Sequence, residues 1–252
     1  MAAKLQPIQN KCLRVVAGAY KATPIRALEI ETYIPPLDLY LDGRLAAFRD
    51  QLANSQVGQS IQEACKVIQR KLRNKKGRRR GYRPIPSLVK DDWAKARLLN
   101  LGDSTEIKRT TEAWTRRWQA GTTKPDTWDR VLQPPDPKIL KLHSGLHKAE
   151  SSALVQLRTG CIGLAYFLHK ARVPGIESGL CSCGNSSETP RHMLIHCNKE
   201  IVQREELKRA SGGRLNLRKL LDTPEGARVT SRWVLRSGCL PQFSLARALL
   251  YE

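Results

Sequence analysis

Acidic residues are scarce in this chain, and so are aromatic residues. Only 23 Asp and Glu accompany 44 Lys and Arg, which leaves a net charge of +21 over 252 residues. A surface of this kind repels itself unless a polyanion is present, so we expect nucleic acid as the leading partner, ahead of an acidic membrane surface. Aromatic residues make up 6% of the chain, so phosphate contacts rather than stacking on many bases should dominate binding.

Long apolar runs and alternating patterns are also lacking. No stretch approaches the roughly 18 apolar residues of a membrane span, and the N-terminal stretch has no apolar signal core. We therefore expect an intracellular protein, nuclear or cytoplasmic and not secreted. The hydrophobic fraction of 40% still permits a real core. Because few segments alternate with period two, the sequence predicts a mainly α fold, in helical segments with a small C-terminal helical module.

Apolar spacing and proline positions divide the chain into three zones, 1–58, 59–135 and 136–252. The first zone should hold three helices, of which the second has Thr23 as its N-cap and Pro24 at its first position. The second should be a basic linker with loosely organised helices. In the third, we expect an amphipathic helix over 138–172, interrupted near Thr159 and Gly160 and continued by a second helix through Leu164, Phe167 and Leu168. A cysteine loop should follow. Further helices are predicted to start near Pro190, Ile201, Leu215, Pro224 and Leu240.

A block of basic residues dominates the second zone. Residues 66–83 contain ten Lys and Arg and no acidic residue. They could contact RNA or DNA phosphates, act as a nuclear localisation signal or form a solvated linker, and these roles are compatible. No pattern for reading bases is present, so we expect weak sequence specificity. The candidate nucleic-acid-binding residues are Arg70, Lys71, Arg73, Lys75, Lys76, Arg78, Arg79, Arg80 and Arg83.

The cysteines of the third zone indicate a metal site. Seven cysteines are an odd number, which argues against a disulfide framework. The spacing Cys-x-Cys-x8-His-x4-Cys offers three thiols and one imidazole, the ligand set of a closed structural zinc site: Cys181, Cys183, His192 and Cys197. Free thiols are the alternative. His192 and Cys197 lie more than one helical turn apart, so His196 could replace a ligand, although we prefer Cys197.

No catalytic constellation accompanies this pattern. Glu188 and Glu200 are the neighbouring carboxylates, and neither belongs to a known hydrolytic motif. We therefore predict a structural zinc, which makes the small C-terminal helical module a zinc-stabilised one. We also predict no enzymatic activity and no small-molecule substrate. Thr189 and Pro190 should cap the helix that carries His192.

Several other residues have a simple structural interpretation. Trp114 and Trp118 share a helix face and are predicted to pack in a core, with base stacking as the alternative. His143 and His147 are predicted to share a helix face at metal-like spacing, but without a Glu between them in a His-Glu-x-x-His pattern they are expected to be surface histidines. Four single cysteines should be small buried hydrophobic residues: Cys12, Cys65, Cys161 and Cys239.

Two segments of the chain resemble one protein family. The stretch from Ser151 and Ser152 through Gln156, Leu157, Arg158, Thr159 and Gly160 to the four ligands is similar to the C-terminal region of fungal non-LTR (LINE-type) retrotransposon reverse transcriptases. The N-terminal stretch LQPIQNKCLRVVAGAYKATPIRALEIETYIPPLDLYL resembles the segment that follows the polymerase domain in that family. The two matches occur in the family's own order and cover roughly half the chain.

The resemblance implies a truncated remnant. Polymerases of this family carry a Tyr-x-Asp-Asp turn, which is absent here, and Asp91-Asp92 is followed by Trp93. The carboxylates of a ribonuclease H domain are lacking as well. The resemblance thus implies a non-catalytic piece that would hold RNA or DNA. The alternative is a domesticated or regulatory nuclear factor that binds unknown protein partners and has a structural zinc site.

Overall fold

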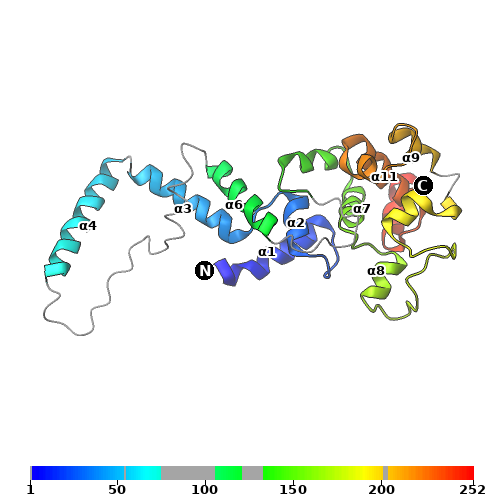
Figure 1. Cartoon of the computed structure of the whole chain (residues 1–252), viewed down its shortest axis with the longest axis horizontal. Coiled ribbons are helices and arrows are strands. Elements are labelled where there is room, and N and C mark those ends of the chain that lie inside the picture. Colours follow the sequence, from blue (N-terminus) through cyan, green and yellow to red (C-terminus); the bar gives the residue numbers. More distant parts are fainter. Residues whose placement is uncertain (1, 54, 75–105, 121–132, 201–203) are drawn as a thin grey trace. The chain divides into compact units, whose positions relative to one another are not determined.

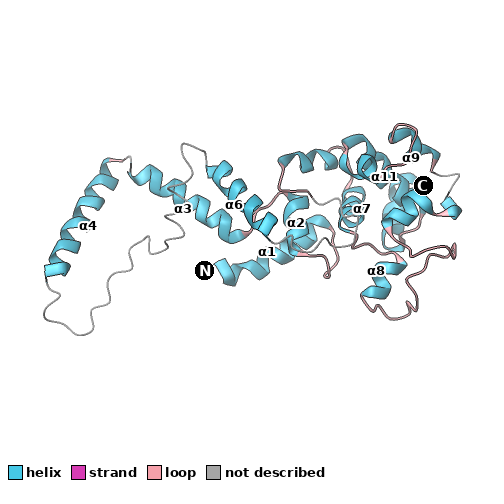
Figure 2. Ribbon diagram, viewed as in Figure 1, coloured by secondary structure: helices cyan, strands magenta, loops and turns pink. Residues whose placement is uncertain are grey.

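The computed structural model describes residues 2–53, 55–74, 106–120, 133–200 and 204–252. Within these ranges the chain forms helices and no strand (Figure 2). The only bridge between extended residues there joins Leu180 to Ser187. The predicted mainly α fold is confirmed. None of the described helices is both long enough and apolar enough to cross a membrane.

Contacts divide the described chain into two compact units. One unit contains residues 3–34 and 117–252, and the other contains residues 35–116. The N-terminal segment, residues 3–34, thus packs with the C-terminal module. Asp91 and Asp92 lie outside the described residues.

The smaller unit is built from long helices, α3 (Leu37–Ala53), α4 (Gln56–Asn74) and most of α6 (Glu106–Ala120). Helix α3 packs against α4, and Ser55 accepts a hydrogen bond from the Gly58 backbone N–H at 3.0 Å, which caps the start of α4. Trp114 of α6 is 3% exposed, which agrees with its interpretation as a packing residue. Trp118, which belongs to the larger unit, is partly buried.

The larger unit is an array of short helices around α7, as Figure 1 shows for its labelled elements. Their bounds are α1 (Ala2–Ala17), α2 (Ile25–Thr32), η1 (Pro137–His143), α7 (Lys148–Thr159), α8 (Ala165–Lys170), η2 (His192–His196), η3 (Asn198–Glu200), α9 (Glu205–Ala210), α10 (Leu217–Asp222), α11 (Pro224–Ser237), η4 (Pro241–Phe243) and α12 (Ser244–Tyr251). The helix expected over 138–172 is therefore three pieces. Gly145 and Gly160 have positive φ of 73° and 68° and separate them.

Helix α7 is the centre of this unit because nine of its 12 residues are buried. Its leucines, Leu154 and Leu157, enter a core with Leu220, Trp233 and other apolar side chains of α10 and α11. A second, smaller core joins Val155 to α1 and α2 through Leu13, Ala17 and Leu28. Helix α7 therefore contributes to both cores and joins the N-terminal segment to the C-terminal module.

Polar contacts reinforce the packing of α1 against α7. The Gln156 side-chain amide donates to the Gly18 carbonyl at 2.8 Å, and the Lys148 ammonium donates to the Val15 and Val16 carbonyls at the end of α1. A cation at a helix C-terminus satisfies carbonyls that the helix itself leaves open. Gly18 has a φ of 61°, and a Cβ built there would overlap the Ser152 side chain.

Three residues far apart in sequence form a buried charge network. The Arg158 side chain is 1% exposed, and its Nε donates to the Glu31 carboxylate of α2 at 2.9 and 3.0 Å. Its Nη1 donates to the Leu221 carbonyl at 2.6 Å and to the Asp222 carboxylate. A buried guanidinium needs such partners to offset its loss of hydration. The network therefore fixes α2, α7 and α10 in one arrangement.

Some local expectations are wrong. The N-cap of α2 is Pro24, and the Thr23 hydroxyl is buried without a hydrogen-bond partner among the described residues. Pro24 takes the cap position because its carbonyl accepts the N–H groups of Ala27 and Leu28. Cys12 is exposed rather than buried, since it lies on the outer face of α1. Cys161 is buried as predicted, Cys239 is partly buried, and the Cys65 side chain lies outside the described part.

The histidine pair also differs from expectation. His143 ends η1 and His147 is the N-cap of α7, so the two do not share a helix face. His143 is partly buried, with Nδ1 2.8 Å from the Ser151 hydroxyl, and burial lowers its pKa from 6.5 to about 4. His147 is exposed as expected.

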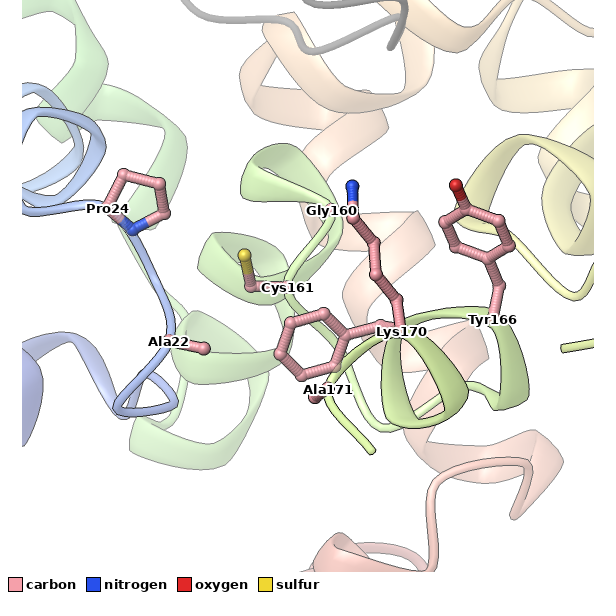
Figure 3. Close-up of a pocket in the computed structure, with 8 residues that line it drawn as sticks. Ala22, Pro24, Gly160, Cys161, Tyr166, Lys170 and Ala171 are labelled. Atoms are coloured by element: carbon pink, nitrogen blue, oxygen red, sulfur yellow. The ribbon is translucent and has the colours of Figure 1, made fainter. Parts of the chain in front are cut away.

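The packing leaves a pocket of about 280 Å³ in the larger unit (Figure 3). One wall comes from the turn before α2, with Ala22 and Pro24. The other comes from the end of α7 and from α8, and its lining residues are Gly160, Cys161, Tyr166, Phe167, Lys170 and Ala171.

Candidate metal centre

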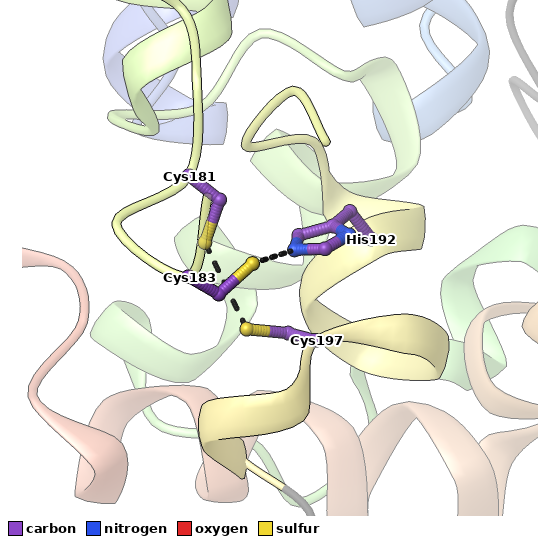
Figure 4. A group of neighbouring side chains, drawn as sticks. All are labelled: Cys181, Cys183, His192 and Cys197. Atoms are coloured by element: carbon purple, nitrogen blue, oxygen red, sulfur yellow. Dashed lines mark hydrogen bonds between the residues drawn. The ribbon is translucent and has the colours of Figure 1, made fainter. Parts of the chain in front are cut away.

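The predicted ligands converge in the larger unit. The ligand atoms of Cys181, Cys183, His192 and Cys197 all lie within 4.8 Å of one another (Figure 4). The two thiol sulfurs of Cys181 and Cys197 are 3.7 Å apart, and the Cys183 sulfur is 3.2 Å from His192 Nε2. The group is shielded from solvent, since Cys181, His192 and Cys197 are 7%, 5% and 4% exposed.

A tight loop supplies the first two ligands. The Cys181 backbone N–H donates to the Ser186 carbonyl at 2.8 Å, and the Gly184 N–H donates to the Cys181 carbonyl at 2.9 Å. Gly184 has a φ of 79°, which only glycine adopts without strain, and it turns the chain directly after Cys183. The loop closes through the antiparallel bridge between Leu180 and Ser187. Both thiols therefore face the same side of one turn.

A helical turn supplies the other two ligands. The Thr189 hydroxyl accepts the His192 N–H at 3.1 Å, so the predicted cap is confirmed. The following segment, η2, is a π-helical turn in which the Cys197 N–H donates to the His192 carbonyl at 2.7 Å. Bonding from residue i to i+5 brings two residues five apart to the same side, which an ordinary α-helix does not do.

This π turn places Cys197, and not His196, in the four-residue group. Cys197 is buried inside the ligand group, whereas His196 is exposed and lies outside it. The expectation that Cys197 is the ligand therefore agrees with the geometry. The Arg204 guanidinium donates to the Cys197 carbonyl and anchors the end of the turn from α9's side.

The side chains fit a tetrahedral cation. Zn–S bonds of about 2.3 Å place the corners of a tetrahedron about 3.8 Å apart, close to the 3.7 Å between the Cys181 and Cys197 sulfurs. Burial raises the pKa of the Cys181 thiol to about 11, while the Asn185 backbone N–H lowers the pKa of Cys183. Burial lowers the pKa of His192, which favours the neutral imidazole that binds metals. Because three thiolates in one buried group repel one another, a bound dication would stabilise them.

The neighbouring carboxylate of Glu188 has a different task. Glu188 accepts the Ala165 backbone N–H at 2.6 Å, at the start of α8. Its own backbone N–H donates to the Gly179 carbonyl at 2.9 Å, next to the ligand loop. Glu188 thus ties the ligand loop to α8. The side chain of Glu200 lies outside the described part.

The predicted nucleic-acid-binding residues are described only in part. Arg70, Lys71 and Arg73 belong to α4, in the smaller unit, and their side chains are not described. The others fall outside the described residues: Lys75, Lys76, Arg78, Arg79, Arg80 and Arg83.

Sequence reasoning missed the buried charge network around Arg158. A usable signal was present, because Arg158 follows the apolar residue Leu154 by four positions and therefore lies on the same face of the predicted helix. A charged residue on an apolar helix face needs a buried partner. No spacing rule, however, identifies Glu31 as that partner.

Segments matched by the resemblance have clear structural tasks. Gln156 holds the end of α1, Arg158 forms the buried network, and Gly160 ends α7.

Comparison with protein-family models gives no match for this chain, and comparisons with curated proteins and with solved structures give none either. What the structure itself shows is a mainly helical fold and a four-residue Cys/His group that could hold a metal ion.

Proposed function

We propose that the chain is a non-catalytic remnant of a retrotransposon reverse transcriptase polyprotein that binds RNA or DNA through phosphate contacts, with zinc as a structural ion. The resemblance of its two segments supports the origin. Zinc is the ion that best suits three thiolates and one imidazole in a tetrahedral group. Four protein ligands leave no coordination position for a substrate, so the ion would stabilise the fold.

The distribution of charge is the observation that carries nucleic-acid binding. Residues 1–28 contain five Lys and Arg and no acidic residue, and residues 66–83 contain ten and none. Residues 151–176 also lack Asp and Glu. Uninterrupted positive segments attract a polyanion and release its counterions on binding. Little sequence specificity is expected, because phosphates are the same at every position.

Salt dependence of binding tests this function. The full chain is titrated with labelled single-stranded RNA and with duplex DNA from about 50 to 200 mM salt, where phosphate-dominated binding weakens steeply. The triple variant Arg78→Gln, Arg79→Gln and Arg80→Gln should flatten the slope by about 2–3. A salt-independent Kd of the wild-type chain would contradict the proposal.

A matched control separates the basic block from overall charge. The triple variant Arg209→Gln, Arg214→Gln and Arg218→Gln removes the same charge from exposed positions of the C-terminal module. It should change the salt slope less than the block variant does. Equal changes would show that the block has no special part in binding.

A second candidate function is a nuclear protein-interaction factor. The observation that favours it is the outer face of α12, where Leu245 and Leu249 are 74% and 77% exposed and lie one turn apart. Exposed leucines at this spacing are typical of helix docking. Crosslinking in cells discriminates the two functions. Recovery of RNA supports the first, and recovery of a stoichiometric protein partner without nucleic acid supports the second.

A further inference from the structure

We propose that the pocket between the turn before α2 and helix α8 holds one unstacked base of a single-stranded nucleic acid, with Lys170 at its phosphate. This inference rests on the proposed nucleic-acid binding and adds to it a mode of recognition. The residues that line this pocket belong neither to the Cys/His group nor to the basic block of residues 66–83.

The shape and lining of the pocket suit a base. Its volume is about 280 Å³, near the lower end of the roughly 300–1,000 Å³ of small-molecule sites, which is room for one nucleoside rather than a longer ligand. Tyr166 and Phe167 offer aromatic rings, and Pro24, Ala22 and Ala171 add apolar contacts. Flat apolar surfaces of this kind take up bases by stacking.

The rings are held in place by their surroundings. The Phe167 ring packs on Tyr20, with ring centroids 5.3 Å apart and planes inclined by 51°. Gly179 lies so close to α8 that a Cβ there would be 3.1 Å from the Tyr166 Cα. Glu188 caps the first turn of the same helix. The residues on either side of the Cys181–Cys183 loop, Gly179 and Glu188, therefore pack against α8 and fix this wall of the pocket.

The charge of the pocket favours an anion. Lys170 is the single charged residue among its lining residues, and in Figure 3 its side chain extends from α8 alongside that of Tyr166. No ion pair between described residues involves Lys170. Both chain segments that build the pocket, within residues 1–28 and 151–176, lack acidic residues. An apolar slot with a cation at its edge matches a base and its phosphate.

Filling the pocket provides the test. Ala171 is exposed at the edge of the pocket, so Ala171→Trp adds a large side chain without disturbing the core. The control, Ala248→Trp, makes the same change at an exposed position of α12. The probes are a single-stranded RNA of uniform sequence and the same strand with abasic sites, each titrated from about 50 to 200 mM salt.

Loss of one stacked base should weaken binding of the intact strand about 5- to 100-fold in Ala171→Trp, at every salt concentration and with an unchanged slope. Abasic sites should weaken wild-type binding by a similar factor and leave the variant unaffected. Lys170→Gln should instead flatten the salt slope by about 0.7, as for one phosphate on a single strand. Ala248→Trp should behave as wild type.

Other outcomes overturn the inference. Equal affinity of wild type and Ala171→Trp for the intact strand, or equal weakening of intact and abasic strands, would show that no base enters the pocket. If salt-dependent binding by the wild-type chain persists in that case, the proposed function stands without the pocket. Absence of salt-dependent binding by the wild-type chain would overturn both.

Discussion

The Arg158 guanidinium lies 2.9 Å from the carboxylate of Glu31, a residue 127 positions earlier in the chain. Both side chains are buried. The pair joins the N-terminal segment to the C-terminal module, and Asp222 extends it to α10. The N-terminal segment and the C-terminal module therefore stabilise each other through one buried arginine.

Loss of this arginine should strongly destabilise the protein. Arg158→Met leaves the Glu31 carboxylate buried without its guanidinium, which costs about 3–5 kcal/mol of unfolding free energy. The matched control is the exposed pair of Arg236 and Glu206, 2.6 Å apart, where Arg236→Met should cost less than about 1 kcal/mol. Urea denaturation compares the two. Similar losses would show that the buried pair has no special weight.

The close approach of α1 and α7 predicts a second effect. Gly18→Ala combines a positive φ with overlap of its Cβ and the Ser152 side chain. Gly145→Ala has the same unfavourable φ but no atom within 4 Å of its Cβ. We expect Gly18→Ala to lower the unfolding free energy by about 1–3 kcal/mol more than Gly145→Ala, the usual cost of overpacking. Thermal unfolding of both variants checks this, and equal losses would rule out the steric contact.

His143 predicts a loss of stability in acid. Its folded-state pKa of about 4 lies below the ordinary 6.5 because burial disfavours the imidazolium, and the positive charges of Arg158 and Lys148 add to this effect. The unfolded chain therefore binds a proton first, and the stabilisation present above pH 6.5 is lost as the pH falls toward 4. The full difference is about 3 kcal/mol.

A variant that lacks only His143 isolates the contribution of this side chain to the pH dependence of stability. His143→Gln should lose less unfolding free energy than the wild type between pH 6.5 and 4, and His169→Gln, at an exposed histidine, should follow the wild type. Urea midpoints measured at several pH values give the comparison. Parallel pH curves for the wild type and His143→Gln would contradict the assignment.

Local sequence patterns predicted much of the fold, but they did not predict contacts between residues far apart in the chain. Proline and glycine positions located helix ends such as Pro224, and cysteine spacing identified all four members of the Cys/His group. The π turn was not predictable, because it depends on one hydrogen bond from Cys197 to His192 rather than on composition. The partner of Arg158 could not be predicted either, since no periodic pattern extends over 127 residues.

The pocket illustrates the same limit. Tyr166 and Lys170 lie one turn apart and could be placed on one face of a helix from sequence alone. Ala22 and Pro24 belong to a distant segment, and only the packing of α1 and α2 on α7 brings them opposite. A cavity built by two segments is visible only once the tertiary contacts are known.

The metal content of the purified full-length chain tests the central claim most directly. We expect about one zinc per chain by native mass spectrometry, as four protein ligands imply. Cys181→Ser and Cys197→Ser should lose the ion, while His196→Gln should keep it because His196 is exposed outside the ligand group. Substoichiometric zinc in the wild-type chain, or retention of the ion by Cys197→Ser together with its loss in His196→Gln, would contradict the proposed site.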